Sequence, residues 1–406
     1  MESVLSNAPS NVSPLVYDAY DYELDSNPHP VFKRLRDEAP IYHNDEYDFW
    51  ALSRFKDVVQ ASLDHETFSS ARSTVLEMIG EELVNPPMIF MDPPQHTSFR
   101  KLVGRTFTPR RMTELEGRVR ALCAGYLDPL VGADEFDYLA EFGAKLPVMV
   151  VSSLLGVPEE DQDQLRIWTE QTLHREPGET GASAVAIAAS QDVFKYWSSQ
   201  IAEKRRNPRD DIMTDLTQAI LQPDDGPERP LEDGELLSFF LLISSAGNET
   251  VARFLGWAAT LLASNPGERE KLVKNPALIE NAVEEILRYE APSPIQARYV
   301  NRDVEFYGTK VPEGSKIALL TASANRDERE FEDADRLDVE RKIQQHLSLG
   351  YGVHFCLGAS LARLEARVAL EETLKRFPSW EVDQSRLEMV HTSTVRGYSK
   401  VWIQPS

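Results

Sequence analysis

Cys356, one of only two cysteines in the chain, lies in a loop whose residues suit a thiolate that binds a metal. Residues 349–358 read Leu-Gly-Tyr-Gly-Val-His-Phe-Cys-Leu-Gly, and the glycines allow a flat partner to approach the backbone closely. A helical pattern follows at Gly358–Phe377, so the sulfur lies at the positive end of a helix dipole, where the pKa of a thiol is lowered. A thiolate that accepts N–H bonds under an apolar cover is what a haem iron requires of a cysteine ligand.

The other cysteine and a zinc site are weaker alternatives. Cys123 lies in a helical stretch between Leu122 and Ala124, and a lone cysteine is usually a small buried hydrophobic residue. No second cysteine lies near Cys356 to complete the four ligands of a zinc site. Two cysteines form no disulfide framework, which fits a reducing cytosol.

The cysteine loop resembles the haem-binding loop of the cytochrome P-450 superfamily, Phe-Gly-x-Gly-x-His-x-Cys-x-Gly, at every position except the first, which is Leu349. The resemblance implies a soluble, bacterial-type protein in which Cys356 binds the iron of haem b (iron protoporphyrin IX). It also implies that Gly350, His354 and Gly358 belong to the cofactor site. The family's Phe is a packing residue, so we expect Leu349 to alter packing and redox tuning rather than ligation.

A glycine and a threonine interrupt the longest helical pattern of the chain, at 246–250 (Ala-Gly-Asn-Glu-Thr). A glycine within a helix costs about 1 kcal/mol relative to alanine, which close approach of a ligand would explain. Thr250 can bond to the carbonyl of Ala246 and bend the helix. The segment resembles the family's Ala/Gly-Gly-x-Asp/Glu-Thr motif. This implies that Ala246 and Gly247 border the haem, and that Glu249 is the acid and Thr250 the alcohol of the catalytic pair that delivers protons to dioxygen. The alternative is a packing notch.

Glu285 and Arg288 lie three residues apart, a spacing that places a carboxylate and a guanidinium on one helix face. Such pairs are commonly surface ion pairs, but this one resembles the family's Glu-x-x-Arg pair. In the family a second arginine completes a buried triad, and Arg336 is the candidate here. The neighbouring Ala334 and Leu337 depart from the family's usual residues. A buried triad is better understood as fixing one fold than as adding stability.

His96 and Arg100 lie four residues apart and therefore share one helix face, where two donors suit an anion. The resemblance implies that they bind the haem propionates, with Arg298 and His354 as further contacts. Four donors around two carboxylates make chemical sense. Taken singly, each would more often be a surface residue.

The resemblance implies an apolar substrate pocket built from 76–90, 168–174, one face of the long helix, 292–296 and 392–395. The side chains that we expect to line it are Phe239, Leu242, Ile243, Ala246, Ile295 and Thr394. This lining predicts a small or medium-sized hydrophobic substrate. The implied activity is that of a monooxygenase, which inserts one oxygen atom from dioxygen into such a substrate.

No flavin or nicotinamide motif occurs in the 406 residues, so we expect electrons to come from a separate ferredoxin and ferredoxin reductase. Some of the cations that flank the cofactor motifs should form the docking patch for the ferredoxin. They are Lys101, Arg105, Arg110, Arg111, Arg363 and Arg367.

Three other functions remain open. A peroxide-using relative of the same fold would lack the acid–alcohol pair, so Glu249 and Thr250 argue against it. A haem-thiolate isomerase, dehydratase or nitric oxide reductase would share the cysteine loop without using dioxygen. A haem-binding sensor or carrier would need no proton-relay pair.

The net charge of −23 argues against nucleic acid or an anionic membrane as a partner. The N-terminus does not resemble a signal peptide and no run of 18 apolar residues occurs, so we expect a cytoplasmic protein. No linker, repeat or low-complexity stretch divides the chain, which predicts a single domain over 1–406, and we expect a monomer.

The elements that must position these residues are mostly helices. The longest expected helix, Asp233–Ser264, would be about 48 Å long at 1.5 Å per residue. The expected class is mainly α with small β-sheets, and the resemblance implies the cytochrome P-450 fold with a long central helix over the haem. The other expected helices cover 30–39, 55–63, 95–130 with a break near 109, parts of 148–220, 266–273, 277–289 and 358–377. The expected strands are 41–43, 49–52, 298–300, 304–307, 316–321 and 401–404.

Overall fold

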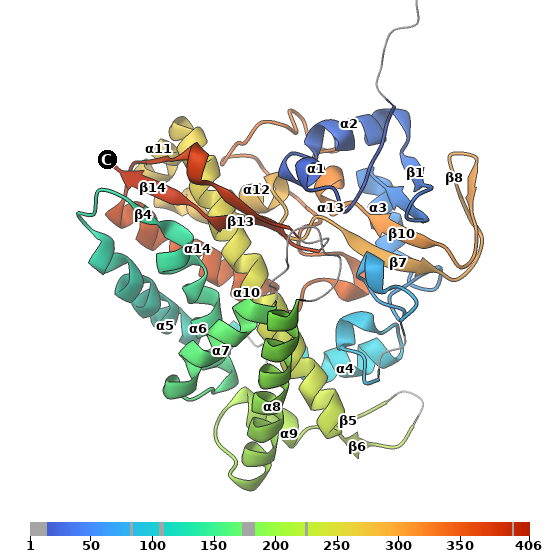
Figure 1. Cartoon of the computed structure of the whole chain (residues 1–406), viewed down its shortest axis with the longest axis horizontal. Helices are drawn as coiled ribbons and strands as arrows, with labels where there is room; N and C mark the ends of the chain where they lie inside the picture. The colour runs from blue at the N-terminus through green and yellow to red at the C-terminus, as the bar shows by residue number, and fades with distance from the viewer. Residues whose placement is uncertain (1–13, 82–83, 105–108, 173–182, 224–225, 392–393) are drawn as a thin grey trace, which may run out of the picture.

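The computed structural model describes residues 14–81, 84–104, 109–172, 183–223, 226–391 and 394–406. Helices form most of the structure and small sheets the rest, so the predicted fold class is confirmed (Figure 1). The helices are α1 (Tyr22–Ser26), α2 (His29–Glu38), α3 (Phe55–Leu63), α4 (Gln95–Gly104), α5 (Pro109–Leu127), α6 (Lys145–Leu155), α7 (Glu159–Thr172), α8 (Ala184–Arg206), α9 (Ile212–Thr217), α10 (Asp233–Ser264), α11 (Pro266–Lys274), α12 (Ile279–Tyr289), α13 (Thr321–Ala324) and α14 (Ala359–Arg376).

The described strands form one five-stranded sheet and four smaller sheets. The order in the large sheet is β1-β2-β10-β7-β3, in which β10 runs parallel to β2 and antiparallel to β7. The strands are β1 (Ile41–Asn44), β2 (Phe49–Leu52), β3 (Phe68–Ser69), β4 (Phe136–Asp137), β5 (Ile220–Leu221), β6 (Arg229–Pro230), β7 (Gln296–Val300), β8 (Val304–Phe306), β9 (Thr309–Val311), β10 (Lys316–Leu319), β11 (Trp380–Val382), β12 (Glu388–His391), β13 (Arg396–Lys400) and β14 (Trp402–Pro405).

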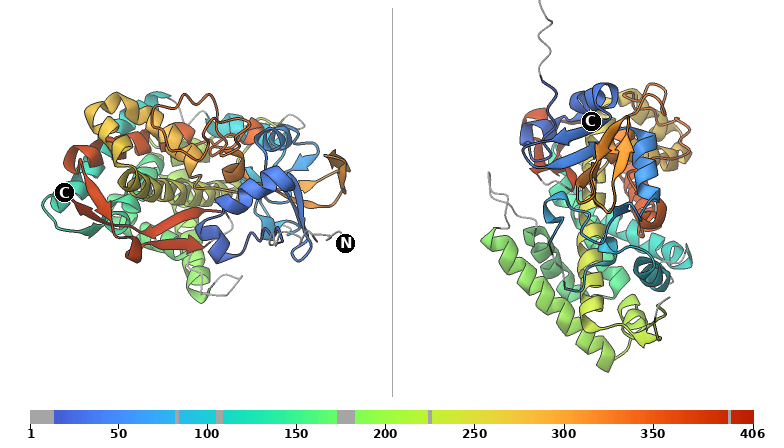
Figure 2. Two further views of the ribbon diagram at one scale, coloured as in Figure 1. Left: turned by 90° about the horizontal axis from the view of Figure 1, so that it is seen from above. Right: turned by 90° about the vertical axis from the view of Figure 1, so that its right-hand side faces the viewer.

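The helix α10 has the bounds that the sequence predicts and crosses the molecule from edge to edge, between the sheets and the other long helices (Figures 1 and 2). It begins with a capping box, in which the side chain of Glu235 accepts the backbone N–H of Glu232 at 2.8 Å. It ends at Ser264 because Pro266 begins the next helix. No described helix, α10 included, has the length and apolar character needed to cross a membrane.

The large sheet is covered by helices on both faces. Ile317 and Leu319 of β10 pack with α3 in one core cluster, whereas Ala318 packs with α2 in another. Successive side chains of a strand point to opposite faces, so β10 connects the two clusters. The sheet therefore holds its central strands rigidly, including β7, which carries Arg298.

Several local predictions agree with the structure. The expected strands at 41–43 and 49–52 pair as the hairpin β1–β2. The expected break near Pro109 falls between the end of α4 and the start of α5, where residues 105–108 lie outside the described residues. Two 3₁₀ turns lie at Leu76–Met78 and Met88–Phe90. The β12–β13 hairpin and the sheet β11-β14-β4 were not expected, because β4 is only two residues long and pairs with a strand far away in sequence.

A buried carboxylate joins α12 to the chain that leads towards the cysteine loop. Glu285 and Arg288 are fully buried, and two hydrogen bonds of 2.7 and 2.8 Å join their side chains. Oε1 of Glu285 also accepts the backbone N–H of Asp338 at 2.9 Å and Nε of Arg341 at 3.1 Å. A carboxylate that accepts this many donors can remain charged in the interior.

The second arginine of the triad is therefore Arg341, and the prediction of Arg336 is wrong. The side chain of Arg336 is 58 % exposed and contacts Asp338, at the surface. It is the carbonyl of Arg336 that turns inward, where it accepts from Arg341 at 3.0 Å. The turn directs its carbonyl oxygens inward, so the side chain of Arg336, within the turn, points outward. Arg341, after the turn, is the arginine that reaches Glu285.

Replacing Arg341 by Met should lower the free energy of unfolding by about 3–5 kcal/mol, because a buried carboxylate loses a charged partner. The matched variant Arg336→Met should change it by less than about 0.5 kcal/mol, because that side chain lies at the surface. Chemical denaturation of the two purified variants beside the unchanged protein measures both values. Equal destabilisation by the two changes would contradict the assignment of Arg341.

Candidate functional site

Cys356 lies three residues before α14, and its backbone N–H donates to the carbonyl of Leu349 at 2.7 Å, which closes the loop. The backbone N–H of Gly358 bonds to the sulfur, and Arg100 and Arg363 add positive charge. Burial outweighs these three effects and raises the pKa of the thiol, so the expectation of a lowered pKa is wrong for the free thiol. A metal cation at the sulfur deprotonates it outright.

Two glycines of the loop are required by the protein's own backbone. Gly350 and Gly352 have φ values of +69° and +67°, which side chains rarely adopt. An added Cβ would lie 3.0 Å from the carbonyl oxygen of His354 at the first position and 2.6 Å from that of Ser62 at the second. These glycines therefore shape the loop and seat it on α3.

Four side chains that can donate hydrogen bonds come from separate segments to the region of Cys356. His96 and Arg100 come from α4, Arg298 from β7 and His354 from the cysteine loop, and the rings of His96 and His354 are 4.3 Å apart. Among the described residues, neither ring nitrogen of His96 and not Nε2 of His354 has a partner, although all are buried. Such atoms call for a hydrogen-bonding ligand.

The charges in this cluster call for an anion. Burial, followed by Arg100, lowers the pKa of His96 to about 4. Burial, followed by Arg298, lowers the pKa of His354 to about 3, and burial lowers that of Arg298 to about 10. The nearby carboxylate of Asp92 accepts the N–H of Ser70 at 2.8 Å, so it is already engaged. An anionic ligand would offset the burial that lowers all three pKa values and the repulsion by arginines that adds to it for the two histidines.

The middle of α10 presents a half-open face within an otherwise buried helix. Ser245 and Ala246 are exposed and Thr250 is half-buried. Oγ1 of Thr250 donates to the carbonyl of Ala246 at 2.9 Å, as the sequence predicts. Helix packing also favours a glycine at position 247, because an added Cβ would lie 3.0 Å from Val151 of α6. The place of Gly247 beside the cofactor stays a prediction.

Glu249 has a partner that was not predicted. Its Oε2 accepts from Arg253, one turn further along α10, at 2.7 Å, and the two side chains are only 14 % and 10 % exposed. Arg253 also donates to the carbonyl of Tyr398 in β13. Sequence spacing alone could have suggested this pair, since the two residues lie four apart in a helix.

The expected pocket residues of α10 lie along the same side of the helix. Phe239 is buried against Phe240 at a ring distance of 5.9 Å, and Leu242 and Ile243 are half-buried against the main core. The half-burial of Leu242 and Ile243 fits a role in lining a site beside Ala246. Parts of the other expected pocket segments, at 82–83, 173–174 and 392–393, lie outside the described residues.

The two expected pocket residues outside α10 differ from each other. Ile295 is buried in the core cluster around Tyr17, and it borders a cavity of only about 20 Å³ with Arg396, so its side chain serves packing. A role for Ile295 in lining the substrate site stays a prediction. Thr394 is half-buried, and its carbonyl accepts Oγ of Ser293 at 3.1 Å, which holds 292–296 against the β13 end.

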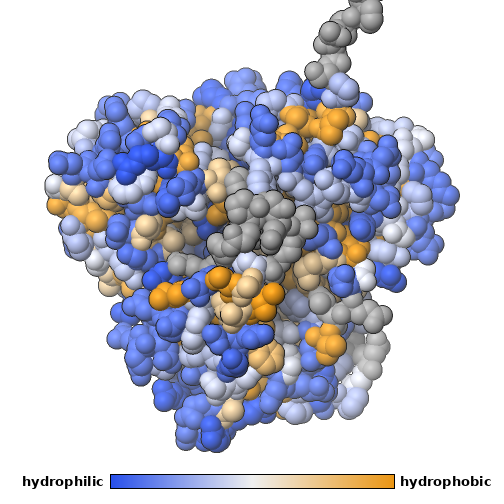
Figure 3. Space-filling model, in the orientation of Figure 1, coloured by the Kyte–Doolittle hydropathy of each residue, from blue (hydrophilic) through white to orange (hydrophobic). Residues whose placement is uncertain are grey.

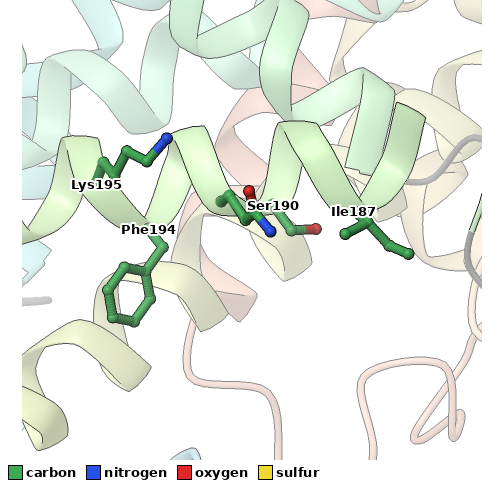
Figure 4. Close-up of a pocket in the computed structure, with 5 residues that line it drawn as sticks. Ile187, Ser190, Phe194 and Lys195 are labelled. Carbon is green, nitrogen blue, oxygen red and sulfur yellow. The ribbon is translucent and has the colours of Figure 1, made fainter. Parts of the chain in front are cut away.

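A wider hollow on the outer face of α8 does not involve these residues. It has a volume of about 560 Å³ and is lined by Ile187, Ser190, Gln191, Phe194 and Lys195, whose side chains point outward (Figure 4). Apolar side chains also gather near the middle of the face shown in Figure 3, where the start of α8 lies in Figure 1. The hollow brings together no ionisable cluster, so the chemistry of the chain lies at Cys356.

Comparison with known proteins identifies this arrangement. A family model described as Cytochrome P450 matches residues 180–399, more than half of the chain. The chain belongs to the cytochrome P450 family. It is accordingly a haem-thiolate monooxygenase whose cofactor is haem b.

Relatives of this cytochrome P450 match it over nearly its whole length. A "Putative cytochrome P450 123" of Mycobacterium bovis is 42% identical over 389 residues, which are 95% of this chain and 96% of that protein. The "Vitamin D(3) 25-hydroxylase" of Pseudonocardia autotrophica is 35% identical and covers 95% of both chains. The solved structure of the Bacillus subtilis 168 cytochrome P450 PksS has a TM-score of 0.87 at 31% identity, and covers 96% of this chain and 100% of that chain.

The residues of this cytochrome P450 fit its cofactor. Haem carries two propionates, and the unpartnered nitrogens of His96 and His354, with Arg100 and Arg298, supply the donors and positive charge that carboxylates need. Cys356 is the one described cysteine beside them. Burial raises the pKa of Cys123, on α5, to about 12, as expected of a packing residue.

Arg298→Met should release haem about ten to a hundred times faster, because a hydrogen bond to a charged group contributes about 1.5–3 kcal/mol. Transfer of haem to an excess of apomyoglobin measures the rate. Arg302→Met is the matched control, since that side chain is 59 % exposed in the loop after β7. If the Arg298→Met protein released haem no faster than the Arg302→Met protein, the assignment of Arg298 to the cofactor site would be wrong.

Proposed function

We propose that this cytochrome P450 inserts one oxygen atom from dioxygen into a small or medium-sized hydrophobic substrate, with electrons from a separate ferredoxin and ferredoxin reductase. The observation that carries the proposal is the half-open face of α10, where the hydroxyl of Thr250 and the carboxylate of Glu249 accompany exposed Ala246. A face that brings an acid and an alcohol next to apolar side chains suits dioxygen chemistry beside a hydrophobic substrate.

The roles of the haem-site residues follow from their chemistry. Bound haem supplies the activation of dioxygen, and the protein positions the cofactor and controls protons. In our proposal Cys356 is the iron ligand, and Gly350 and Gly358 belong to the loop that presents it. His96, Arg100, Arg298 and His354 hold the propionates. The backbone N–H of Gly358 bonds to the sulfur of Cys356, which supports the place of Gly358 in this loop.

Thr250 and Glu249 are the proposed proton-delivery pair. The Thr250 hydroxyl donates to the carbonyl of Ala246, which fixes its oxygen on the open face of α10. Glu249 is the acid that takes up protons and passes them towards that oxygen. The pair argues for dioxygen turnover over a peroxide-using enzyme, an isomerase, a dehydratase, a nitric oxide reductase or a sensor, none of which needs it.

We propose a hydrophobic substrate because the side chains expected on the α10 side of the site, Phe239, Leu242, Ile243 and Ala246, are all apolar. The name of the Pseudonocardia relative, a vitamin D(3) hydroxylase, agrees with a hydrophobic substrate of moderate size. A library of such compounds, screened for the spectral change that follows displacement of water from the iron, tests the proposal. If no compound of the library produced this spectral change, the proposed hydrophobic substrate would be contradicted.

The proposed ferredoxin surface lies on the Cys356 side, where Phe355 is 39 % exposed. Two expected docking cations are already paired there: Arg363 with Glu284 at 2.7 Å, and Arg367 with Glu116 at 2.8 Å. Arg105 and the side chains of Arg110 and Arg111 lie outside the described residues. The remaining candidate is Lys101, which is exposed on α4 next to Arg100.

We further propose that the chain acts as one cytoplasmic domain and as a monomer. The acidic surface charge and the lack of a disulfide framework support a cytosolic location. Arg288 of α12, whose neighbours Ile286 and Leu287 lie in the main core, donates to the carbonyl of Ala334 in a second core cluster, and β10 connects that cluster to the third. These connections support a single domain over 1–406.

Thr250→Ala should retain haem and substrate binding but release severalfold more of the consumed electrons as peroxide, because the alcohol that guides protons is lost. Oxygen consumption, peroxide and product are measured together. Thr260→Ala is the matched control: this threonine makes the same bond to the carbonyl four residues back on α10, at 3.1 Å, but is buried in the core. If Thr250→Ala converted the same share of consumed electrons into product as the unchanged protein, the role assigned to Thr250 would be wrong.

Lys101→Glu should slow reduction by ferredoxin at low salt, and the difference should shrink at high salt as charges are screened. Stopped-flow reduction under carbon monoxide measures the rate. Lys274→Glu, at a lysine that is 70 % exposed on α11, is the control. Equal rates for the two variants at low salt would exclude Lys101 from the docking surface.

A further inference from the structure

Arg253 occupies an unusual place beside the proposed proton-delivery acid. It is only 8 % exposed, and it divides its donors between the carboxylate of Glu249, at 2.7 Å, and the carbonyl of Tyr398 in β13. Its Nε is buried without a partner among the described residues. A buried guanidinium with an unused donor is costly, so a purely structural role explains it poorly.

The contact between Arg253 and β13 depends on a glycine in that strand. Gly397, with φ +154°, lets β13 approach α10 so closely that an added Cβ would lie 2.7 Å from Cβ of Arg253. Trp257, one turn further along α10, donates to the carbonyl of Arg396 at 3.2 Å. Two hydrogen bonds from α10 to β13 therefore fix Arg253 at a set position.

The side chains of Thr250 and Glu249, the proposed proton-delivery pair, form hydrogen bonds in opposite directions along α10. The hydroxyl of Thr250 points back one turn to the carbonyl of Ala246, whereas the carboxylate of Glu249 points forward one turn to Arg253. In this arrangement the acid does not hydrogen-bond to the alcohol. Glu249 must leave Arg253 before it can serve Thr250.

We propose that Arg253 is a positioning residue that holds Glu249 in a resting place away from Thr250 and thereby controls when a proton is delivered. This rests on the proposed function of Glu249 and Thr250. In the step, the Glu249 carboxylate takes up a proton from hydronium in the solvent, gives up the hydrogen bond from Nη2 of Arg253 and turns towards Thr250. It passes that proton to the Thr250 hydroxyl, which releases its own proton into the site, and the restored carboxylate returns to Arg253. Arg253 stays charged throughout and keeps its bond to the carbonyl of Tyr398.

The other described groups that face this part of α10 are either uncharged or already paired, so we assign Arg253 as the charged partner of Glu249. From β13, Arg396 is bound to Glu290 and lies over the ring of Trp257 at 4.5 Å, so its charge is already compensated. Tyr398, also on β13, contributes its carbonyl, and burial raises the pKa of its phenol. From α6, the contact at the neighbouring turn is the apolar Val151.

The test is a double-mutant cycle read from the C–O stretch of the ferrous carbon monoxide complex, which responds to the field on the α10 side of the haem and requires no turnover. Arg253→Met should shift or split this band, because the carboxylate is released. The same change in a Glu249→Gln background should have almost no effect, since its target is gone. Arg253→Lys, which keeps the charge, should restore most of the original band.

Arg269→Met is the matched control, because Arg269 is also 8 % exposed and donates to a backbone carbonyl, that of Trp380, at 2.7 Å. It should leave the band unchanged. With a substrate in hand, the solvent hydrogen isotope effect on turnover should fall in Arg253→Met, because release from Arg253 is no longer part of proton delivery. If Arg253→Met loses haem, Arg253→Gln, which keeps a donor for Tyr398, replaces it in the cycle.

An unmoved band in Arg253→Met, or an equal shift with and without Glu249, would overturn the proposal. Because the cycle needs no turnover, it judges the contact between Arg253 and Glu249 independently of monooxygenase activity. Failure of the proposed function would appear elsewhere, as unchanged coupling in Thr250→Ala.

Discussion

The main constraint on this structure is a buried group of donor side chains and positive charges, which the nearby and already hydrogen-bonded carboxylate of Asp92 does not fully compensate. His96, Arg100, Arg298 and His354 come from a helix, a sheet and a loop, and each has its pKa depressed first by burial. Holding them together requires that all three supports be rigid. The large sheet provides this for Arg298, because helices cover both of its faces.

The sulfur of Cys356 poses the complementary problem, since burial disfavours its charged form and only an N–H and two arginines favour it. The loop is fixed by its own hydrogen bond to Leu349 and by glycines that no other residue could replace without a clash. Behind the loop, the carboxylate of Glu285 binds Arg288 and Arg341 and so ties α12 to the chain that leads to the cysteine. Rigidity here makes the sulfur available at one place.

Helix α10 combines packing and chemistry along one element. Gly247 permits close contact with α6, and three residues later Thr250 turns its hydroxyl back to the helix on the open face. Glu249 and Arg253 then connect that face to β13. The capping box at Glu232 and the proline at 266 set where the helix begins and ends, so the place of the site along α10 depends on residues at both ends of the helix.

The sequence by itself determined the features that depend on local chemistry: the bounds of α10, the hairpin β1–β2, the cysteine loop, and the pairs Glu285–Arg288 and His96–Arg100, each set by short spacing along the chain. Tertiary structure alone decided which arginine reaches Glu285, because the choice between Arg336 and Arg341 depends on how a turn directs its carbonyls. It also decided that Gly247 packs against α6, that Ile295 belongs to the core cluster around Tyr17, and that Cys356 is not acidified by the protein alone. In each of these cases the deciding contact or the burial comes from segments far apart in sequence, which residue spacing does not encode.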